Sequence, residues 1–237
     1  MRSLPSDQST VDTTAYEGEI QLVFSQVYLL MTLGLVITAV VAAWVANSPG
    51  LVERLFFRNP GMLLGLFVVQ LIVVVVLSAA ISKMPAGLAT GLFILYSALT
   101  GLTLSVIFLI YTDASIVTTF FITAGTFAAM SIFGYVTKRD LTKLGSLFLM
   151  LLIGFVLASL VNLFLRSTTL YWILTFGGIV IFVGLIAYDT QKIKQLAAAG
   201  FADGRSRTSV AILGALRLYL DFINLFLLLL RLFGRRR

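Results

Sequence analysis

Residues 218–226 read LYLDFINLF, and the apolar run that holds them continues to Phe233, ahead of a basic end at Arg235–Arg237. Asp221 is a carboxylate within a run that otherwise suits lipid or a protein interior. A charge in that setting costs roughly 3 kcal/mol on insertion scales unless it is paired, hydrated or protonated. A second acid, Asp189, closes the preceding apolar segment. We expect these two acids to form the functional centre.

The composition indicates an integral membrane protein. Of the 237 residues, 59% are apolar and 11% charged, with a mean hydropathy of +1.05, whereas soluble proteins have roughly 25% charged residues. The apolar runs are too long for an outer-membrane barrel, whose strands alternate over about 10 residues. The net charge of +7 comes from basic residues near the ends of apolar runs, which indicates membrane topology rather than nucleic-acid binding.

The chain has no Cys and no His. Disulfides, thiol chemistry and the usual transition-metal ligands are therefore excluded. Because His is the usual switch near neutral pH, any response to pH has to come from carboxylates or Lys.

Seven apolar segments have about the length that crosses a bilayer. They predict an all-α fold, a polytopic membrane protein built as one seven-transmembrane helix bundle over residues 21–237, behind a polar N-terminal tail over residues 1–20. The segments cover residues 23–45, 62–81, 88–110, 116–135, 147–165, 171–188 and 213–233.

With seven crossings and a cytoplasmic N-terminus, the basic residues are only weakly biased toward the cytoplasmic side. If the last segment instead dipped in and returned, Arg231 and Arg235–Arg237 would join the other basic residues on the cytoplasmic side, which the positive-inside rule prefers. We keep seven crossings and leave the side of the C-terminus open. We place Asp221 about 6 Å inside the membrane boundary, because Arg217 has to reach water four residues earlier, at roughly 1.5 Å per residue.

The seventh segment carries a polar stripe when it is drawn as a helix. A polar stripe on an apolar helix faces a bundle interior or water, which predicts that this helix is central. The residues at alternating spacings of three and four are Gly214, Arg217, Asp221, Asn224, Leu228 and Arg231.

Two interpretations of the acids stay open. In the first, both are structural: Arg217 pairs with Asp221 on its own helix, and Lys192 pairs with Asp189. In the second, the acids meet and share a proton, because like charges in a poorly hydrated site cannot both ionise easily. A shared proton links the two helices, whereas ionisation of both acids separates them and exposes oxygen ligands for Ca²⁺. Asn224 is expected to be an interhelical hydrogen-bond partner.

Four stretches resemble the Bax inhibitor family, also called TMBIM, and its bacterial members in particular. They are residues 96–104 (YSALTGLTL), 134–141 (GYVTKRDL), 187–191 (AYDTQ) and 218–226 (LYLDFINLF). The last two are specific, and the resemblance spans nearly the whole chain after the tail.

The resemblance implies a seven-helix bundle with the seventh helix central, in the bacterial inner (cytoplasmic) membrane. It also implies a pH-sensitive calcium leak without enzymatic activity or a cofactor. Asp189 and Asp221 fall on the family's gating pair and are the expected ligands of the calcium ion. Arg217, Asn224 and Lys192 are candidate modulators of that pair.

Two other functions are considered. The protein could regulate a membrane-bound protease by binding it, as some bacterial relatives are associated with such a protease. Alternatively, the two acids could serve an intramembrane aspartyl protease. Those proteases carry Gly-x-Gly-Asp at the second acid, whereas this chain has Leu218-Tyr219-Leu220-Asp221, so this is the less favoured alternative.

Overall fold

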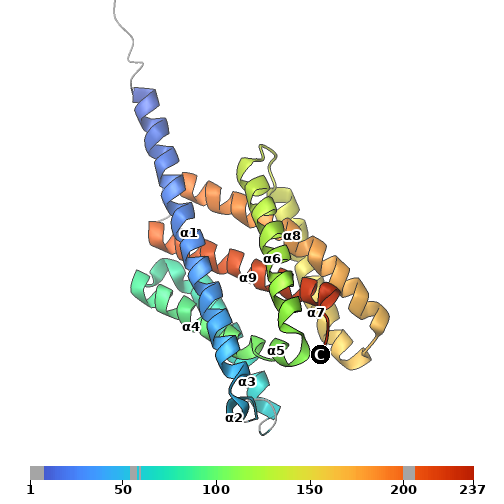
Figure 1. Cartoon of the computed structure of the whole chain (residues 1–237). Coiled ribbons are helices and arrows are strands. Elements are labelled where there is room, and N and C mark those ends of the chain that lie inside the picture. Colours follow the sequence, from blue (N-terminus) through green and yellow to red (C-terminus); the bar gives the residue numbers. More distant parts are fainter. Residues whose placement is uncertain (1–7, 54–57, 59, 200–205) are drawn as a thin grey trace, which may run out of the picture.

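The computed structural model describes residues 8–53, 58, 60–199 and 206–237, and nearly all of them are helical. The predicted all-α class is confirmed. The helices are α1 (Gln8–Ala46), α2 (Pro49–Val52), α3 (Pro60–Ala80), α4 (Ala86–Leu104), α5 (Ile107–Ile110), α6 (Asp113–Val136), α7 (Thr142–Leu165), α8 (Thr168–Ala198) and α9 (Arg207–Phe233), with a 3-10 turn, η2 (Ile81–Lys83), after α3 (Figure 1).

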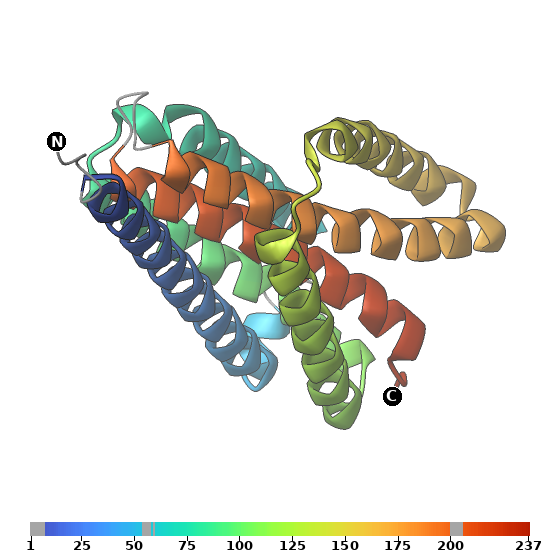
Figure 2. The same cartoon turned by 90° about the horizontal axis from the view of Figure 1, so that it is seen from above.

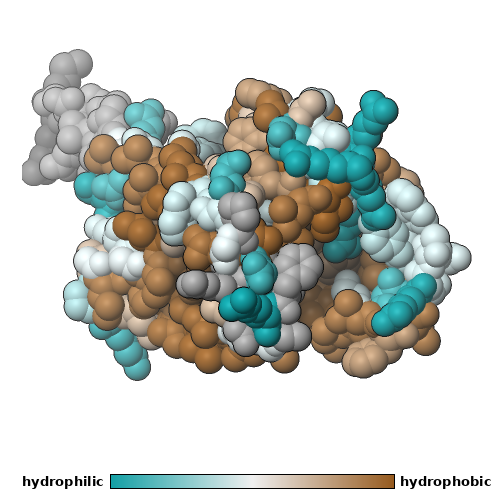
Figure 3. Space-filling model, turned by 60° about the horizontal axis from the view of Figure 1, so that its bottom comes forward, coloured by the Kyte–Doolittle hydropathy of each residue, from teal (hydrophilic) through white to brown (hydrophobic). Residues whose placement is uncertain are grey.

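Six stretches of the described chain are long and apolar enough to cross a membrane. They are α1 from Gly18 onward, α4 continued by α5, α6, α7, α8 and α9. The apolar part of α3, Leu64–Ala80, is shorter. Large apolar side chains are widely exposed on these helices, and apolar residues cover most of the face shown in Figure 3. The chain is therefore a polytopic membrane protein, and the seventh crossing stays a prediction.

The helix α9 is the most buried of these stretches. It packs against α1, α4, α6 and α8, and in Figures 1 and 2 it runs between them. The side chains of Leu218, Tyr219 and Leu225 are fully buried. By contrast, α7 buries only Gly145, and Figure 2 shows α7 on the outer side of α8.

The first helix is longer than its apolar segment. It begins at Gln8, so the described part of the expected N-terminal tail is helical, while residues 1–7 lie outside the described residues. Glu19 of α1 forms an ion pair with Arg207 at the start of α9, in which Arg207 Nε donates to Glu19 Oε2 at 2.9 Å. This pair brings the early part of α1 to the N-terminal end of α9.

The C-terminal tail lies at the other end of α9. The amide of Thr112 donates to the carbonyl of Arg235 at 3.0 Å, and that of Arg237 donates to Ile110 at 2.9 Å. A segment that dips in and returns is therefore wrong: α9 is one continuous helix, and its tail is held at the α5–α6 loop, opposite the α6–α7 loop. Arg237 also donates to Asp113 at 2.7 Å, which adds a side-chain contact to the backbone pairing of the tail.

Candidate functional site

A cavity of about 840 Å³ lies between α7, α8 and α9 and holds both acids. Asp189 is 8% exposed and Asp221 is 5% exposed. Both carboxyl groups line this cavity, one from α8 and one from α9, and they lie near enough for their charges to interact. Asp221 Oδ2 is buried and has no hydrogen-bond partner among the described residues. Buried polar atoms without a partner are rare and require an explanation.

Close contacts with two neighbouring helices hold Asp189 in place. On one side, Gly134 of α6 lets the two backbones meet, because a Cβ there would collide with the carbonyl of Ala187. On the other side, the ring of Tyr188 lies on Gly145 of α7, where a Cβ would also collide. The two residues before Asp189 are therefore packed against α6 and α7, which sets the rotation of α8 at the acid.

Arg217 joins the two helices that carry the acids. Its Nη1 donates to Asp189 Oδ1 at 3.1 Å, and its side chain is 41% exposed. The interpretation that pairs Arg217 with Asp221 along one helix is not what the structure shows. Arg217 reaches from α9 across to α8, so its partner is the acid on the neighbouring helix and not the acid one turn along its own helix.

The expected partner of Asp189, Lys192, lies near a different acid. Hydrogen bonds from Thr142, together with the charges of Lys143 and Lys192, hold the pKa of Asp140 below its usual value. Asp140 belongs to the α6–α7 loop and accepts a hydrogen bond from the Thr142 amide at 2.9 Å. Lys192 therefore contributes to the electrostatics of this loop. The basic residue beside Asp189 is Arg217, where Lys192 was expected.

Both helices that carry the acids extend beyond the predicted apolar segments. The helix α8 continues from Asp189 to Ala198, beyond the end of the apolar segment that this acid closes. Asp221 lies near the midpoint of α9, which begins at Arg207, and its depth below the membrane boundary stays a prediction. The helix starts early because the Ser206 side chain accepts a hydrogen bond from the Ser209 amide at 3.1 Å and caps it.

Asn224 follows Asp221 by one turn and lines the same cavity. Its amide donates to the carbonyl of Leu220 on its own helix at 2.9 Å. The interhelical hydrogen bond expected of Asn224 is therefore wrong: the side chain faces a cavity, and the carbonyl one turn earlier is the nearest acceptor. Asn224 also lines a second cavity, of about 440 Å³, which extends toward Arg231.

Gln191 is a residue of this site that the sequence motifs did not single out. Gln191 is buried, its Nε2 donates to the carbonyl of Arg139 at 2.8 Å, and its Oε1 accepts from the amide of Leu141 at 2.8 Å. The α6–α7 loop is thereby attached to α8 two residues after Asp189. Gln191 belongs to the AYDTQ motif (residues 187–191), which could have drawn attention to it. The sequence does not show that its amide binds the α6–α7 loop, because that contact forms only in the tertiary fold.

Replacing Gln191 with alanine is expected to loosen this loop. Each of its two hydrogen bonds contributes about 1 kcal/mol, so amide exchange at Leu141 should become about tenfold faster or more. Hydrogen–deuterium exchange with peptide resolution measures this. Gln195→Ala on the exposed side of α8 is the control and should leave Leu141 protected. Unchanged protection in Gln191→Ala would show that the loop does not depend on this side chain.

The comparisons with known proteins agree with this architecture. The chain matches the family model described as "Inhibitor of apoptosis-promoting Bax1" over residues 20–237. It is 53% identical over 238 residues to "Inner membrane protein YbhL" of Escherichia coli (strain K12), covering 100% of both chains. It is also 45% identical over 230 residues to an uncharacterized protein of Borreliella burgdorferi, covering 96% of this chain and 99% of the relative. For an uncharacterized membrane protein of Streptococcus pyogenes serotype M1 the identity is 40% over 215 residues, covering 90% and 92%. The chain belongs to the Bax inhibitor family.

Proposed function

We propose that this protein is a pH-sensitive calcium leak channel of the bacterial inner membrane, gated by a proton that Asp189 and Asp221 share. The observation that carries the proposal is the pair of buried carboxyl groups, one on α8 and one on α9, within one cavity. The named E. coli relative, an inner membrane protein, supports the location.

Arg217 determines which protonation state is neutral. With both acids ionised, the group of Arg217, Asp189 and Asp221 carries one net negative charge, and with one shared proton it carries none. Neutrality is favoured in a poorly hydrated cavity. At acidic pH the shared proton therefore ties α8 to α9. When the pH rises and the proton leaves, repulsion between the carboxylates separates the helices.

Separation of the acids would also prepare a calcium route. Ca²⁺ takes six to eight oxygen ligands, many of them carboxylate oxygens. Among the described residues no group of three or more acidic side chains gathers that could hold a metal ion. Two carboxylates completed by water suit a weakly held, passing ion. Asn224 adds an amide to the wall between the acid cavity and the second cavity toward Arg231.

The proposal includes seven crossings, with α3 as the second and α9 central, and a cytoplasmic N-terminus. Lys138, Arg139, Lys143 and Lys192 lie at the α6–α7 loop end of the bundle, and basic residues favour the cytoplasm. Because Arg207 at the start of α9 pairs with Glu19, the N-terminal part of α1 belongs to this end.

A leak requires no catalysis, and the position of Arg217 argues against an aspartyl protease. Such enzymes activate water between two carboxyl groups that share a proton, whereas Arg217 occupies one oxygen of Asp189. Regulation of a membrane-bound protease by binding stays a prediction.

The test is calcium entry into liposomes that contain the purified protein and a trapped calcium dye. Entry is expected to rise as the pH increases from about 6 to about 8, by up to tenfold per pH unit because one proton leaves the pair. Protein-free liposomes are the control for passive leakage. Equal entry with and without the protein at every pH would overturn the proposal and favour a binding role.

A further inference from the structure

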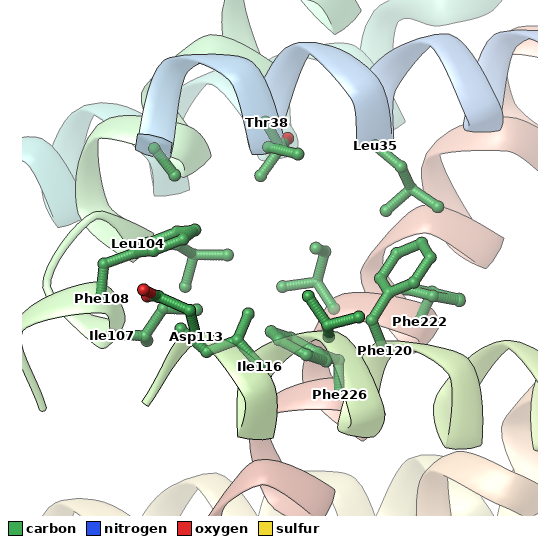
Figure 4. Close-up of a pocket in the computed structure, with 14 residues that line it drawn as sticks. Leu35, Thr38, Leu104, Ile107, Phe108, Asp113, Ile116, Phe120, Phe222 and Phe226 are labelled. Carbon is green, nitrogen blue, oxygen red and sulfur yellow. The ribbon is translucent and has the colours of Figure 1, made fainter. Parts of the chain in front are cut away.

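A separate cavity of about 300 Å³ lies between α1 and α6, with α9 as its floor. Figure 4 shows Leu35 and Thr38 on the α1 side, facing Phe120 on α6 across the space. Phe222 and Phe226 of α9 contribute rings to the wall. This cavity contains neither acid of the gating pair.

The interior of this cavity suits an apolar occupant. Thr38 and Asp113 are its only lining residues with polar side chains. The Thr38 hydroxyl already contacts the carbonyls of Gly34 and Ser97, each at 2.9 Å, and the hydroxyl of Tyr219 at 2.6 Å. A polar ligand would find no free partner deep inside, and an apolar cavity does not hold water well.

The cavity opens sideways at the surface that faces lipid. Ala39 of α1 and Val117 of α6 both line it, and both are exposed. Their outward neighbours, Val40 and Phe121, are 61% and 68% exposed. In a chain that spans a bilayer, an opening among such residues meets acyl chains, which are the abundant slender apolar molecules at that depth.

The end of the cavity nearest the α5–α6 loop is positively charged. Asp113 lines the cavity and is paired with Arg237. The tail contributes Arg235 and Arg236 as well, and all three arginines are exposed. Asp113 is the one acidic side chain named here against three guanidinium groups, and arginine binds phosphate oxygens well, so this end suits a phosphate.

We propose that this cavity binds one acyl chain of a membrane phospholipid, whose phosphate lies against the C-terminal arginines. This lipid site is proposed independently of whether the protein conducts calcium. Because Phe222 follows Asp221 in α9, the bound chain would contact the helical turn that carries the acid. A free fatty acid or a detergent molecule in the same space would contradict the assignment, and the mass of the bound molecule distinguishes these cases.

Native mass spectrometry of the detergent-purified protein tests the proposal. The wild-type chain should retain one phospholipid. Ala39→Trp and Val117→Trp fill the cavity from opposite walls, and each should reduce the fraction of protein that retains lipid about tenfold. The reason is that the new ring displaces more than one methylene group of the acyl chain, and each buried methylene stabilises binding. Val40→Trp and Phe121→Trp are the matched controls, because each places the same ring one or four residues away on the outer surface, and both should retain the lipid.

The headgroup is tested with an equal mixture of phosphatidylglycerol and phosphatidylethanolamine that have the same acyl chains. The wild-type protein should prefer the anionic lipid, and Arg237→Gln should reduce that preference severalfold. The proposal is overturned if wild-type protein retains no phospholipid, if the filled variants retain it as well as their controls, or if the bound mass is that of a fatty acid. Size-exclusion elution shows whether each variant is folded. If a filled variant is not folded, the result with the wild-type protein still decides the proposal.

Discussion

Calcium entry through Asp221→Asn is expected to stay low at every pH between about 6 and about 8, with less than a twofold change across that range because no proton is left to share. The asparagine amide can donate permanently to Asp189, as the shared proton does in the wild-type pair. The remaining charges, Arg217 and Asp189, neutralise one another at 3.1 Å. The variant should therefore resemble the acidic, closed state. The dye-loaded liposomes described above measure this directly.

Asp189→Asn should remove the pH response by the same reasoning, because Asp221 then becomes the only acid beside Arg217. The matched control is Asp140→Asn, which changes an exposed carboxylate of the α6–α7 loop outside the cavity. That variant should keep the wild-type pH profile. A wild-type profile in both Asp221→Asn and Asp189→Asn would remove the pair from the gating mechanism. A flux that rises toward acidic pH would reverse the proposed sign.

The second large effect is structural and concerns the contact between α6 and α8. Gly134→Ala is expected to lower the free energy of unfolding by about 2 kcal/mol, the middle of the range for overpacking a well-packed interior. The cause is backbone contact: the added methyl group would overlap the carbonyl of Ala187, and a backbone cannot change rotamer to make room. For a chain of this size the midpoint of thermal unfolding should fall by about 4–8 °C.

Gly125→Ala on the same helix is the control for this prediction. A Cβ at Gly125 meets no heavy atom within 4 Å, and alanine has a higher helix propensity than glycine by about 1 kcal/mol. Its melting temperature should be unchanged or slightly higher. Thermal unfolding in detergent, followed by circular dichroism, compares the two variants. Equal midpoints would show that the α6–α8 approach is looser than the structure indicates.

Much of the architecture follows from local sequence. Long uncharged runs can satisfy their backbone groups in lipid only as helices, so the all-helical membrane class needed no tertiary information. The polar stripe around Asp221 was also predictable, because helical periodicity determines which residues share a face. The burial of α9 among α1, α4, α6 and α8 is consistent with that stripe. The family resemblance then singled out Asp189 as the second acid.

The choice of partners was decided by the tertiary structure. Spacing along α9 made Asp221 the nearest acid to Arg217, yet Arg217 binds Asp189. Lys192 was likewise spaced to meet Asp189 but lies near Asp140. Helical periodicity relates residues of one helix, whereas a contact between helices depends on their relative rotation and on how closely their backbones approach. Here Gly134 and Gly145 set that approach for α8, and both are more than forty residues away from Asp189 in the sequence.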